Sequence, residues 1–202
     1  MPKDIAVVSY DLDPTSALTT DAIVVRDTLN ANGYAAQLVH QWSFDETNPT
    51  TFKRAADWER YDGVVVCNFY DAWPVRELVR AARPTILLNV GYVDDFGVGE
   101  RLQDHTAENV FVVTDEKHPI TAGAGLPLGP VNIGNPVFSD SVSTLNHHVD
   151  VLLTTMANQA VLTAHKTEPL AYFAWYRLSA SQPGSPLRSL LVQTANWTFA
   201  GP

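Results

Sequence analysis

A strand–helix–strand unit in the first half of the chain constrains the fold most strongly. Two apolar runs, residues 63–67 and 85–91, bracket a segment whose apolar positions recur with the period of a helix. The apolar positions on one face of this helix are Val75, Leu78, Val79 and Ala82. Asp71 is its predicted cap. A unit of this kind is a crossover between parallel strands, and functional sites gather where parallel strands end.

The segments before this unit continue the same alternation. Residues 5–10 form a predicted strand that is buried on both faces, because its apolar residues run without interruption by polar ones. A helix is predicted over residues 19–32, with Thr19 or Thr20 as its N-cap and Asn32-Gly33 as its C-terminal stop. A second strand is predicted over residues 35–41. Together these elements indicate an α/β domain built on a parallel sheet.

The pattern changes after residue 91. A loop is predicted over residues 92–103, a strand over residues 109–114, and a long excursion rich in Pro and Gly over residues 119–146. The last quarter is rich in β-branched and aromatic residues, which favours antiparallel strands. The predicted strands there are residues 149–155, 159–163, 170–178 and 189–194. No shift in composition divides the chain, so we predict a single domain over residues 1–202.

Composition excludes several classes of function. The formal net charge is −9, and nucleic-acid binding needs clustered Lys and Arg to neutralise phosphates. A single cysteine excludes an intramolecular disulfide, and no glycine-rich phosphate loop follows a predicted strand. We therefore expect neither a nucleic-acid partner nor a nucleotide cofactor. Charged residues make up 17% of the chain, and typical soluble domains have about 25%. A low charge content is typical of surfaces that are buried in assemblies.

The ends and the apolar runs of the sequence bear on its location. No apolar run approaches the length of about 18 residues that a membrane span requires. The first residues lead directly into a predicted strand, without the apolar segment of a signal peptide. We therefore expect no contact with a membrane, and a protein that is cytoplasmic or is incorporated into a virion.

Six segments together resemble class I glutamine-amidotransferase-like domains, and especially the branch that includes trehalose-utilisation-type proteins. The most specific segment is His-Pro-Ile-Thr-Ala-Gly at residues 118–123, which follows Asp115. The other segments are residues 8–13, 32–34, 61–66, 83–88 and 189–197. The resemblance implies a flavodoxin-like, three-layer α/β sandwich with a mostly parallel sheet and antiparallel C-terminal strands. It also implies that residues 189–197 form the closing strand of the fold.

The chain departs from this family at the catalytic position. Catalytic members carry a Gly-x-Cys-x-Gly elbow at the strand end that matches residues 88–91 here. Asn89 and Val90 occupy that position, and neither side chain can attack a carbonyl carbon. His165 and Glu168 have a spacing that would suit a histidine–carboxylate dyad, but such a dyad would have no nucleophile to activate. We therefore predict a protein that is not an enzyme.

Cys67 ends the third predicted strand, one strand before the family's nucleophile. A reactive thiol needs a nearby cation or a helix N-terminus to lower its pKa, and a buried, inert cysteine is the simpler expectation. Asp11 and Asp13 follow the first strand, and residues 94–95 add two more carboxylates after the fourth. If these carboxylates converge, they would suit Ca²⁺ or Mg²⁺. His147 and His148 are expected to point to opposite faces of a strand, which does not suit a metal.

Two functions follow from these observations. The first is a non-catalytic scaffold that serves as a structural or interaction module of a larger assembly, such as a virion surface or decoration protein. Its protein partners, or further copies of the chain, are expected to contact part of residues 119–146, with little dependence on salt. The alternative is a hydrolase or a small-ligand or metal-binding protein that uses a cleft at the C-terminal edge of the sheet. The candidate pocket residues are Asp11, Asp13, Cys67, Asn89, His165 and Glu168.

Overall fold

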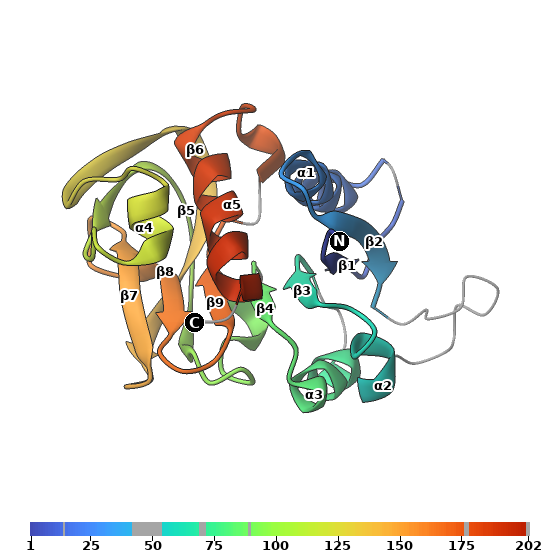
Figure 1. The fold of residues 1–202 in the computed structure, drawn as a ribbon. Helices are drawn as coiled ribbons and strands as arrows, with labels where there is room; N and C mark the ends of the chain where they lie inside the picture. The colour runs from blue at the N-terminus through green and yellow to red at the C-terminus, as the bar shows by residue number, and fades with distance from the viewer. Residues whose placement is uncertain (14, 42–53, 69–71, 89, 176–177, 201–202) are drawn as a thin grey trace.

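The structure is a computed structural model that describes residues 1–13, 15–41, 54–68, 72–88, 90–175 and 178–200. The nine strands within these ranges belong to one sheet with the order β2-β1-β3-β4-β9-β8-β6-β5-β7. Helices cover both faces of the first part of this sheet (Figure 1). None of the helices within the described ranges is long and apolar enough to cross a membrane.

The first five strands of this order are parallel and form the core of the α/β fold. They are β2 (Ala35–His40), β1 (Asp4–Ser9), β3 (Gly63–Val66), β4 (Thr85–Leu87) and β9 (Leu170–Phe173). Residues 5–8 and 64–66 are completely buried, as the uninterrupted apolar runs predict for strands covered on both faces. The predicted α/β sandwich with a parallel sheet and antiparallel strands toward the C-terminus is confirmed.

Two pairs of helices enclose the parallel strands. Helices α1 (Ala17–Ala31) and α5 (Pro186–Ala200) lie on one face, and α2 (Ala55–Trp58) and α3 (Ala72–Ala81) lie on the other (Figure 1). The short helix α4 (Pro119–Gly123) packs against α5. The helices therefore form the outer layers of a three-layer sandwich.

Helix α1 begins earlier than predicted. Its N-cap is Ser16, whose hydroxyl accepts the backbone N–H of Leu18 at 3.3 Å. Thr19, which we expected near the cap, is buried one turn further on and donates its hydroxyl to the carbonyl of Asp11 at 2.9 Å. The helix stops at Asn32 and is followed by Gly33, whose φ of +88° favours glycine, as predicted.

The predicted apolar stripe of α3 is partly wrong. Val75 and Leu78 are buried, whereas the side chain of Val79 is 43% exposed. Glu77 takes the inward position because its carboxylate accepts the backbone N–H of Ala55 at 3.1 Å. Ala82 lies beyond the helix end in a left-handed conformation with φ of +48°. The predicted cap Asp71 lies outside the described residues.

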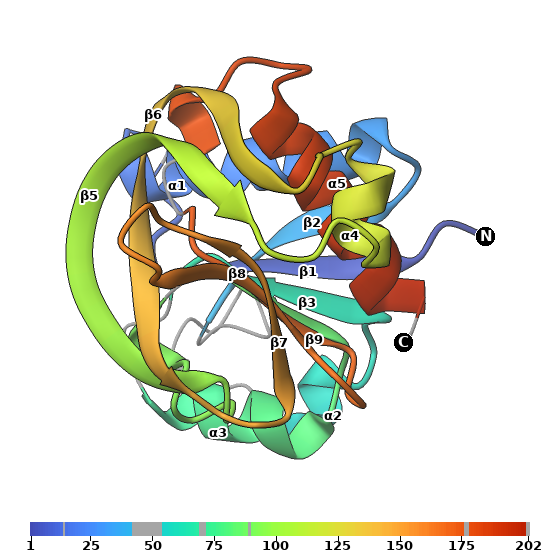
Figure 2. The ribbon, with the colours of Figure 1, turned by 90° about the vertical axis from the view of Figure 1, so that its left-hand side faces the viewer.

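The remaining strands form an antiparallel half that closes on itself. They are β5 (Gly99–Val113), β6 (Gly129–Leu145), β7 (Val149–Thr154) and β8 (Ala160–His165). β7 pairs with both β5 and β8, while β6 pairs with the same two strands, so the four strands form a ring. Figure 2 shows the long strands β5 and β6 curving around β7 and β8. The rings of Phe111 and Phe173 pack edge-on against Trp175 and join this half to β9.

Residues 119–146 do not form the predicted loop. They contain α4 and the 17-residue strand β6, which pairs with β5. Val131 and Ile133 are buried in the core, and Leu128 is 60% exposed. Antiparallel pairing with β5, with three shifts of register, therefore takes up most of a segment whose Pro and Gly content resembled that of a loop.

The prediction of a strand over residues 189–194, and of a closing strand to residue 197, is wrong. These residues lie within α5. The buried positions are spaced by three and four residues, which is the helical period. They are Leu187, Leu190, Leu191, Thr194, Ala195, Thr198 and Phe199. The strand was predicted from the β-branched residues of this segment, and the helical period of its apolar residues was overlooked.

Gly63, at the start of β3, permits α5 to approach the sheet. A Cβ atom at Gly63 would lie 2.5 Å from Cε1 of the buried Phe199 ring. The three atoms nearest to a Cβ at Gly123 all belong to the flexible side chain of Gln193, and the nearest is its amide oxygen at 2.6 Å. We expect Gly63→Ala to reduce the free energy of unfolding by about 1–3 kcal/mol through overpacking. In urea denaturation the matched control Gly123→Ala should be neutral or slightly stabilising, and equal effects of the two variants would contradict this packing.

His118 lies in the turn before Pro119. It is the N-cap of α4, and its Nδ1 atom accepts the backbone N–H of Ile120 at 3.3 Å. Its ring lies 5.3 Å from that of Trp197. Burial lowers the pKa of His118, and the charges of Asp115 and Asp150 oppose this shift only in part.

The lowered pKa of His118 predicts a loss of stability in mild acid. The unfolded chain binds this proton below about pH 6.5, whereas the folded chain resists binding it. The stabilisation is therefore complete above that pH and is lost as the pH falls toward the folded-state pKa. His118→Asn retains a capping side chain, so in urea denaturation from pH 7 to 5 it should lose less stability than the unmodified chain. An equal loss in both proteins would contradict this role.

Candidate functional site

The C-terminal edge of the parallel strands carries a group of buried polar side chains. Ser9 ends β1 and is fully buried, and Cys67 and Asn68 follow β3 with 3% and 8% of their surface exposed. The backbone N–H of Cys67 donates to the carbonyl of Val8 at 3.0 Å, which extends the pairing of the two strands. This edge is where α/β sheets usually bind ligands.

Asp21 adds a buried carboxylate to this edge. It lies in the second turn of α1 with 2% of its surface exposed. Its Oδ1 atom accepts the backbone N–H of Ser179 at 2.9 Å and also the hydroxyl of the same residue. Ser179 belongs to the 3₁₀ turn η2 (Leu178–Ala180), so the carboxylate connects α1 to the segment that follows β9. Sequence analysis did not identify either residue.

The environment of Cys67 opposes formation of a thiolate. Burial raises the pKa of its thiol, and the nearby negative charge of Asp21 raises it further. Reactive cysteines have the opposite environment, with a cation or a helix N-terminus that lowers the pKa. The predicted buried position of Cys67 is confirmed. The Cys67 thiol is therefore protonated at neutral pH.

Asp11 and Asp13 lie beyond the end of β1, where they stabilise their own turn. The Oδ1 atom of Asp11 accepts the backbone N–H of Asp13 at 2.9 Å. The Oδ1 atom of Asp13 accepts the backbone N–H and the hydroxyl of Thr15 at 2.9 and 2.8 Å. These hydrogen bonds from Thr15 lower the pKa of Asp13, which keeps its carboxylate ionised. Both side chains act as turn formers.

The second pair of carboxylates lies elsewhere. Asp95 lines a pocket with Thr85, at the beginning of β4, and so lies far from the strand ends near Asp11. Burial raises the pKa of Asp95, the charge of Asp94 raises it further, and Arg76 opposes the shift. Among the described residues, which include all four of these aspartates, no three Asp, Glu, His or Cys side chains gather to hold a metal ion.

His165 and Glu168 lie at the opposite edge of the sheet from Cys67. β8 runs antiparallel to β9, so its last residue, His165, lies beside the start of β9. The Nδ1 atom of His165 accepts the backbone N–H of Glu168 at 3.1 Å, and the Glu168 side chain is exposed. Glu168 lines the same pocket as Thr85, which has a volume of about 440 Å³. The predicted pocket residues therefore do not form one site.

The position that matches the family's elbow follows β4. Asn89 lies outside the described residues, and the 3₁₀ turn η1 (Val90–Tyr92) comes directly after it. The preceding Leu88 is buried, and its backbone N–H donates to the carbonyl of Val66 at 2.9 Å. The end of β4 is thus paired with the end of β3, and Cys67 directly follows β3.

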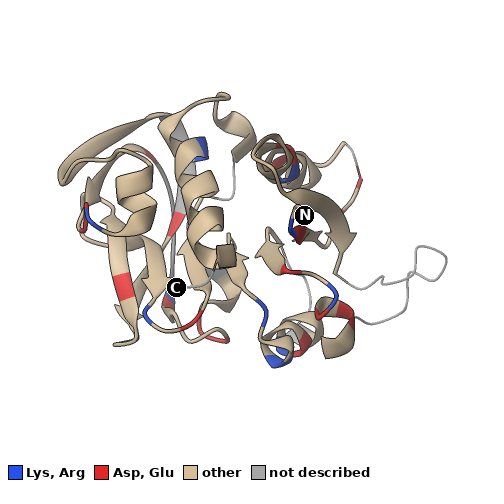
Figure 3. Cartoon of the chain, viewed as in Figure 1, with Lys and Arg blue, Asp and Glu red and all other residues tan. Residues whose placement is uncertain are grey.

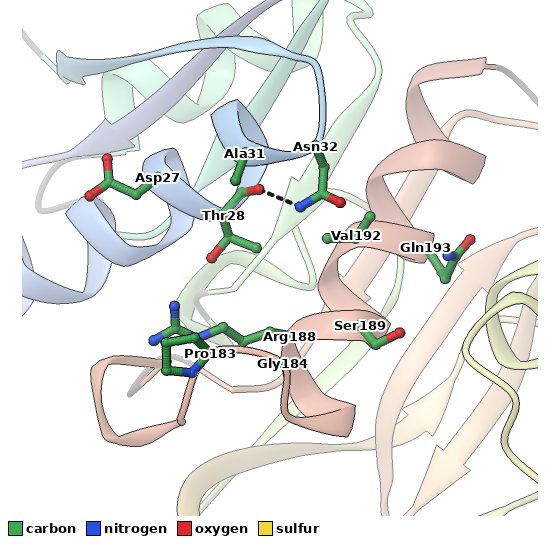
Figure 4. Close-up of a pocket in the computed structure, with 10 residues that line it drawn as sticks. All are labelled: Asp27, Thr28, Ala31, Asn32, Pro183, Gly184, Arg188, Ser189, Val192 and Gln193. Carbon is green, nitrogen blue, oxygen red and sulfur yellow. Dashed lines mark hydrogen bonds between the residues drawn. The ribbon is translucent and has the colours of Figure 1, made fainter.

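A separate groove of about 470 Å³ lies between α1 and the start of α5 (Figure 4). Arg188 forms one side of it and donates from Nη2 to the carbonyl of Ser181 at 2.7 Å and from Nε to the Ser181 hydroxyl at 3.1 Å. Asp27 lies on the α1 side and is paired with Arg26 at 2.7 Å. The groove lies on the helical face of the sandwich, away from the strand ends.

His147 and His148 differ from the prediction that they point apart. Their ring centroids are 3.7 Å apart, and the ring of His148 lies 5.9 Å from that of His165. They precede β7 in a turn, so the alternation of a strand does not apply to them. Because the Nδ1 atom of His165 accepts backbone N–H groups, this ring cannot donate from that nitrogen to a supporting group, as metal ligands usually do.

Comparison with known proteins identifies the fold. No family model and no curated protein matches the sequence. Among solved structures, a ThuA-like protein from Bacteroides uniformis superposes with a TM-score of 0.70 and 13% identity, over 98% of this chain and 91% of that chain. The chain has the amidotransferase-like α/β fold.

Two further solved structures support this assignment of the fold. The glutaminase domain of Trypanosoma brucei CTPS, with bound acivicin, gives a TM-score of 0.58 at 11% identity over 98% of this chain and 94% of that chain. A glutamine amidotransferase from Thermotoga maritima gives 0.56 at 7% identity over 98% and 99%. At such low identity the likeness extends to the fold, so function has to be argued from this chain's own side chains.

The buried position of Cys67 predicts how the chain responds to its replacement. Cys67→Ala should reduce the free energy of unfolding by about 1–2 kcal/mol through lost packing. Cys67→Ser should reduce it at least as much, because a buried hydroxyl without a partner carries a desolvation penalty. Urea denaturation of both variants measures these effects. If neither variant changes stability, the packing role of Cys67 is wrong.

Proposed function

We propose that this chain is an amidotransferase-like scaffold that does not perform cysteine-dependent chemistry and serves as a structural or interaction module of a larger assembly. The position of its single thiol carries the proposal. Cys67 follows β3, whereas the family's nucleophile follows the strand that matches β4. Burial and Asp21 both raise the pKa of this thiol, and an attack on an amide carbon requires the thiolate.

The position of His165, the candidate base, also supports the proposal. A nucleophile is activated by a histidine within hydrogen-bond reach, which is oriented in turn by a third group. His165 lies at the other edge of the sheet, where its Nδ1 atom accepts two backbone N–H groups. These hydrogen bonds to His165 support a structural role in a turn for His165 and Glu168, although their spacing in the sequence resembles that of a catalytic dyad.

The surface of the chain supports a role in an assembly. The chain has 17% charged residues, fewer than usual, and the exposed side of α3 carries the large apolar side chains of Trp73 and Val79. Residues 119–146 contribute less than the sequence suggested, because Val131 and Ile133 are buried within the chain. A virion surface or decoration protein is one assembly that this proposal includes.

A second candidate function has one specific observation in its favour. Asp21, Ser179 and Cys67 bring a buried carboxylate, a hydroxyl and a thiol to the edge where this fold binds ligands. Under this alternative the chain binds or hydrolyses a small molecule there. A bound small molecule detected by native mass spectrometry, and lost in Asp21→Asn, would favour the alternative over the scaffold.

The scaffold proposal predicts the outcome of an activity assay combined with a mass measurement. The chain should release no ammonia from glutamine above the level of Cys67→Ala, with a glutamine amidotransferase of the same fold as positive control. Light scattering should show species larger than the 22.2 kDa monomer as concentration rises. Ammonia release that is abolished by Cys67→Ala would contradict the first part. A monomer at every concentration, alone and with candidate partners, would contradict the second.

A further inference from the structure

The outward side of α3 combines apolar and cationic side chains. Trp73 is 49% exposed and Val79 is 43% exposed, which makes them two of the six large apolar side chains that are most exposed among the described residues. Arg76 and Arg80 are exposed on the same side, at spacings of three and four residues. We call these four side chains the α3 face. Trp and Arg are the residues most enriched at energetic centres of protein interfaces.

The charge of the α3 face is opposite to that of the molecule. Residues 72–83 contain three arginines and one glutamate, although the chain has a formal net charge of −9. The one glutamate, Glu77, is buried and is paired with Arg80 at 2.6 Å. Figure 3 shows basic residues on the outer side of α3 and an acidic residue in the loop between β1 and α1. An acidic surface is therefore the electrostatic complement of the α3 face.

A pocket continues the α3 face. Val79 belongs to both, and the 440 Å³ pocket has Leu78, Phe96 and Leu170 among its apolar walls. Apolar anchors on interfaces commonly insert into pockets of this kind. The α3 face therefore offers an apolar surface with an adjoining recess and arginines beside it.

The complementary feature lies on the same chain. Leu12 is 39% exposed and is flanked by the carboxylates of Asp11 and Asp13. The hydrogen bonds from Asp13 and Thr15 to these carboxylates, together with the bond from Thr19 to the Asp11 carbonyl, fix the turn. A rigid turn loses little conformational entropy on binding, so its exposed leucine is prepared to act as an anchor.

We propose that the α3 face is a contact surface between copies of this chain and receives the acidic turn, residues 11–13, of a neighbouring copy. The inference rests on the proposed role in an assembly, and it names both the surface and its occupant. The turn leads into α1 on one face of the sheet, and α3 lies on the other, so the two features are separate on one molecule (Figure 1). The contact is therefore head-to-tail and generates a ring or a filament.

The charges around the pocket restrict how the turn is seated. Asp95 and Glu168 lie on the pocket wall and would repel the incoming carboxylates. Burial raises the pKa of Asp95, the charge of Asp94 raises it further, and Arg76 lies near enough to oppose the shift, so Arg76 borders this acidic wall. The turn of the neighbouring copy therefore binds with Leu12 against Val79 and with its two carboxylates directed toward Arg76. Association should weaken at high salt, in contrast to the weak dependence that the sequence predicted.

Two variants that each lack one half of the contact provide the test. Arg76→Glu with Val79→Glu removes the α3 face and leaves the Arg80–Glu77 pair intact, while Leu12→Arg removes the anchor and leaves both carboxylates of the turn. Arg101→Glu and Leu128→Arg are the matched controls, because both residues are exposed on other elements. Circular dichroism and thermal melting confirm that each full-length variant is folded. Sedimentation velocity then measures association over a range of concentrations at low and high salt.

Each variant alone should weaken self-association by about tenfold or more, and the controls should not. When the two variants are mixed, the intact turn of one meets the intact α3 face of the other, so a 1:1 dimer should form and grow no further. If the unmodified chain associates and neither variant differs from its control, or if the mixture stays monomeric, this inference is overturned and the assembly role stands. If the unmodified chain is monomeric throughout, this inference is overturned, and the assembly role is overturned with it only if the chain also binds no candidate partner. Binding of some other acidic protein to α3 would not restore the inference.

Discussion

Burial of the parallel strands on both faces is the constraint on which the rest of the structure depends. Residues 5–8 and 64–66 have no exposed surface and are all apolar, so the polar side chains next to them on β1 and β3 lie where these strands end. Ser9, Cys67 and Asn68 occupy those ends, and Asp21 closes over them from α1. The same burial that stabilises the sheet raises the pKa of the Cys67 thiol. Packed polar side chains occupy the edge of the sheet at which α/β proteins usually have a reactive site.

The direction of the strands in the antiparallel half determines where His165 and Glu168 lie. Because β8 reverses direction relative to β9, its last residue lies at the edge where the parallel strands begin. A histidine and a glutamate three residues apart thus form a turn, in which Nδ1 of His165 accepts backbone N–H groups. The spacing of two residues in a sequence does not reveal the direction of the strand that carries them. It therefore could not distinguish this turn from a catalytic dyad.

Local signals predicted the parallel half well and the rest less well. The stop at Gly33, the buried Cys67 and a strand in each of the apolar runs at 63–67 and 85–91 follow from short-range patterns, and the structure confirms them. The second strand, β4, ends at Leu87, and residues 90–91 belong to a 3₁₀ turn. The helix at residues 186–200 was missed although its buried positions keep a helical period, because β-branched residues received more weight. Asp21 and Ser179 are 158 positions apart, and nothing in the sequence indicates that they meet.

The reactivity of Cys67 in the folded chain tests the central claim most directly. Alkylation by iodoacetamide, followed by intact mass against pH in native and denaturing buffer, reports thiolate formation at this one site. The account predicts that the native protein reacts far more slowly than the denatured chain at every pH from neutral to mildly alkaline, at a rate limited by opening of the structure. Rapid alkylation of the native protein at neutral pH would show an accessible thiolate and contradict the non-catalytic scaffold.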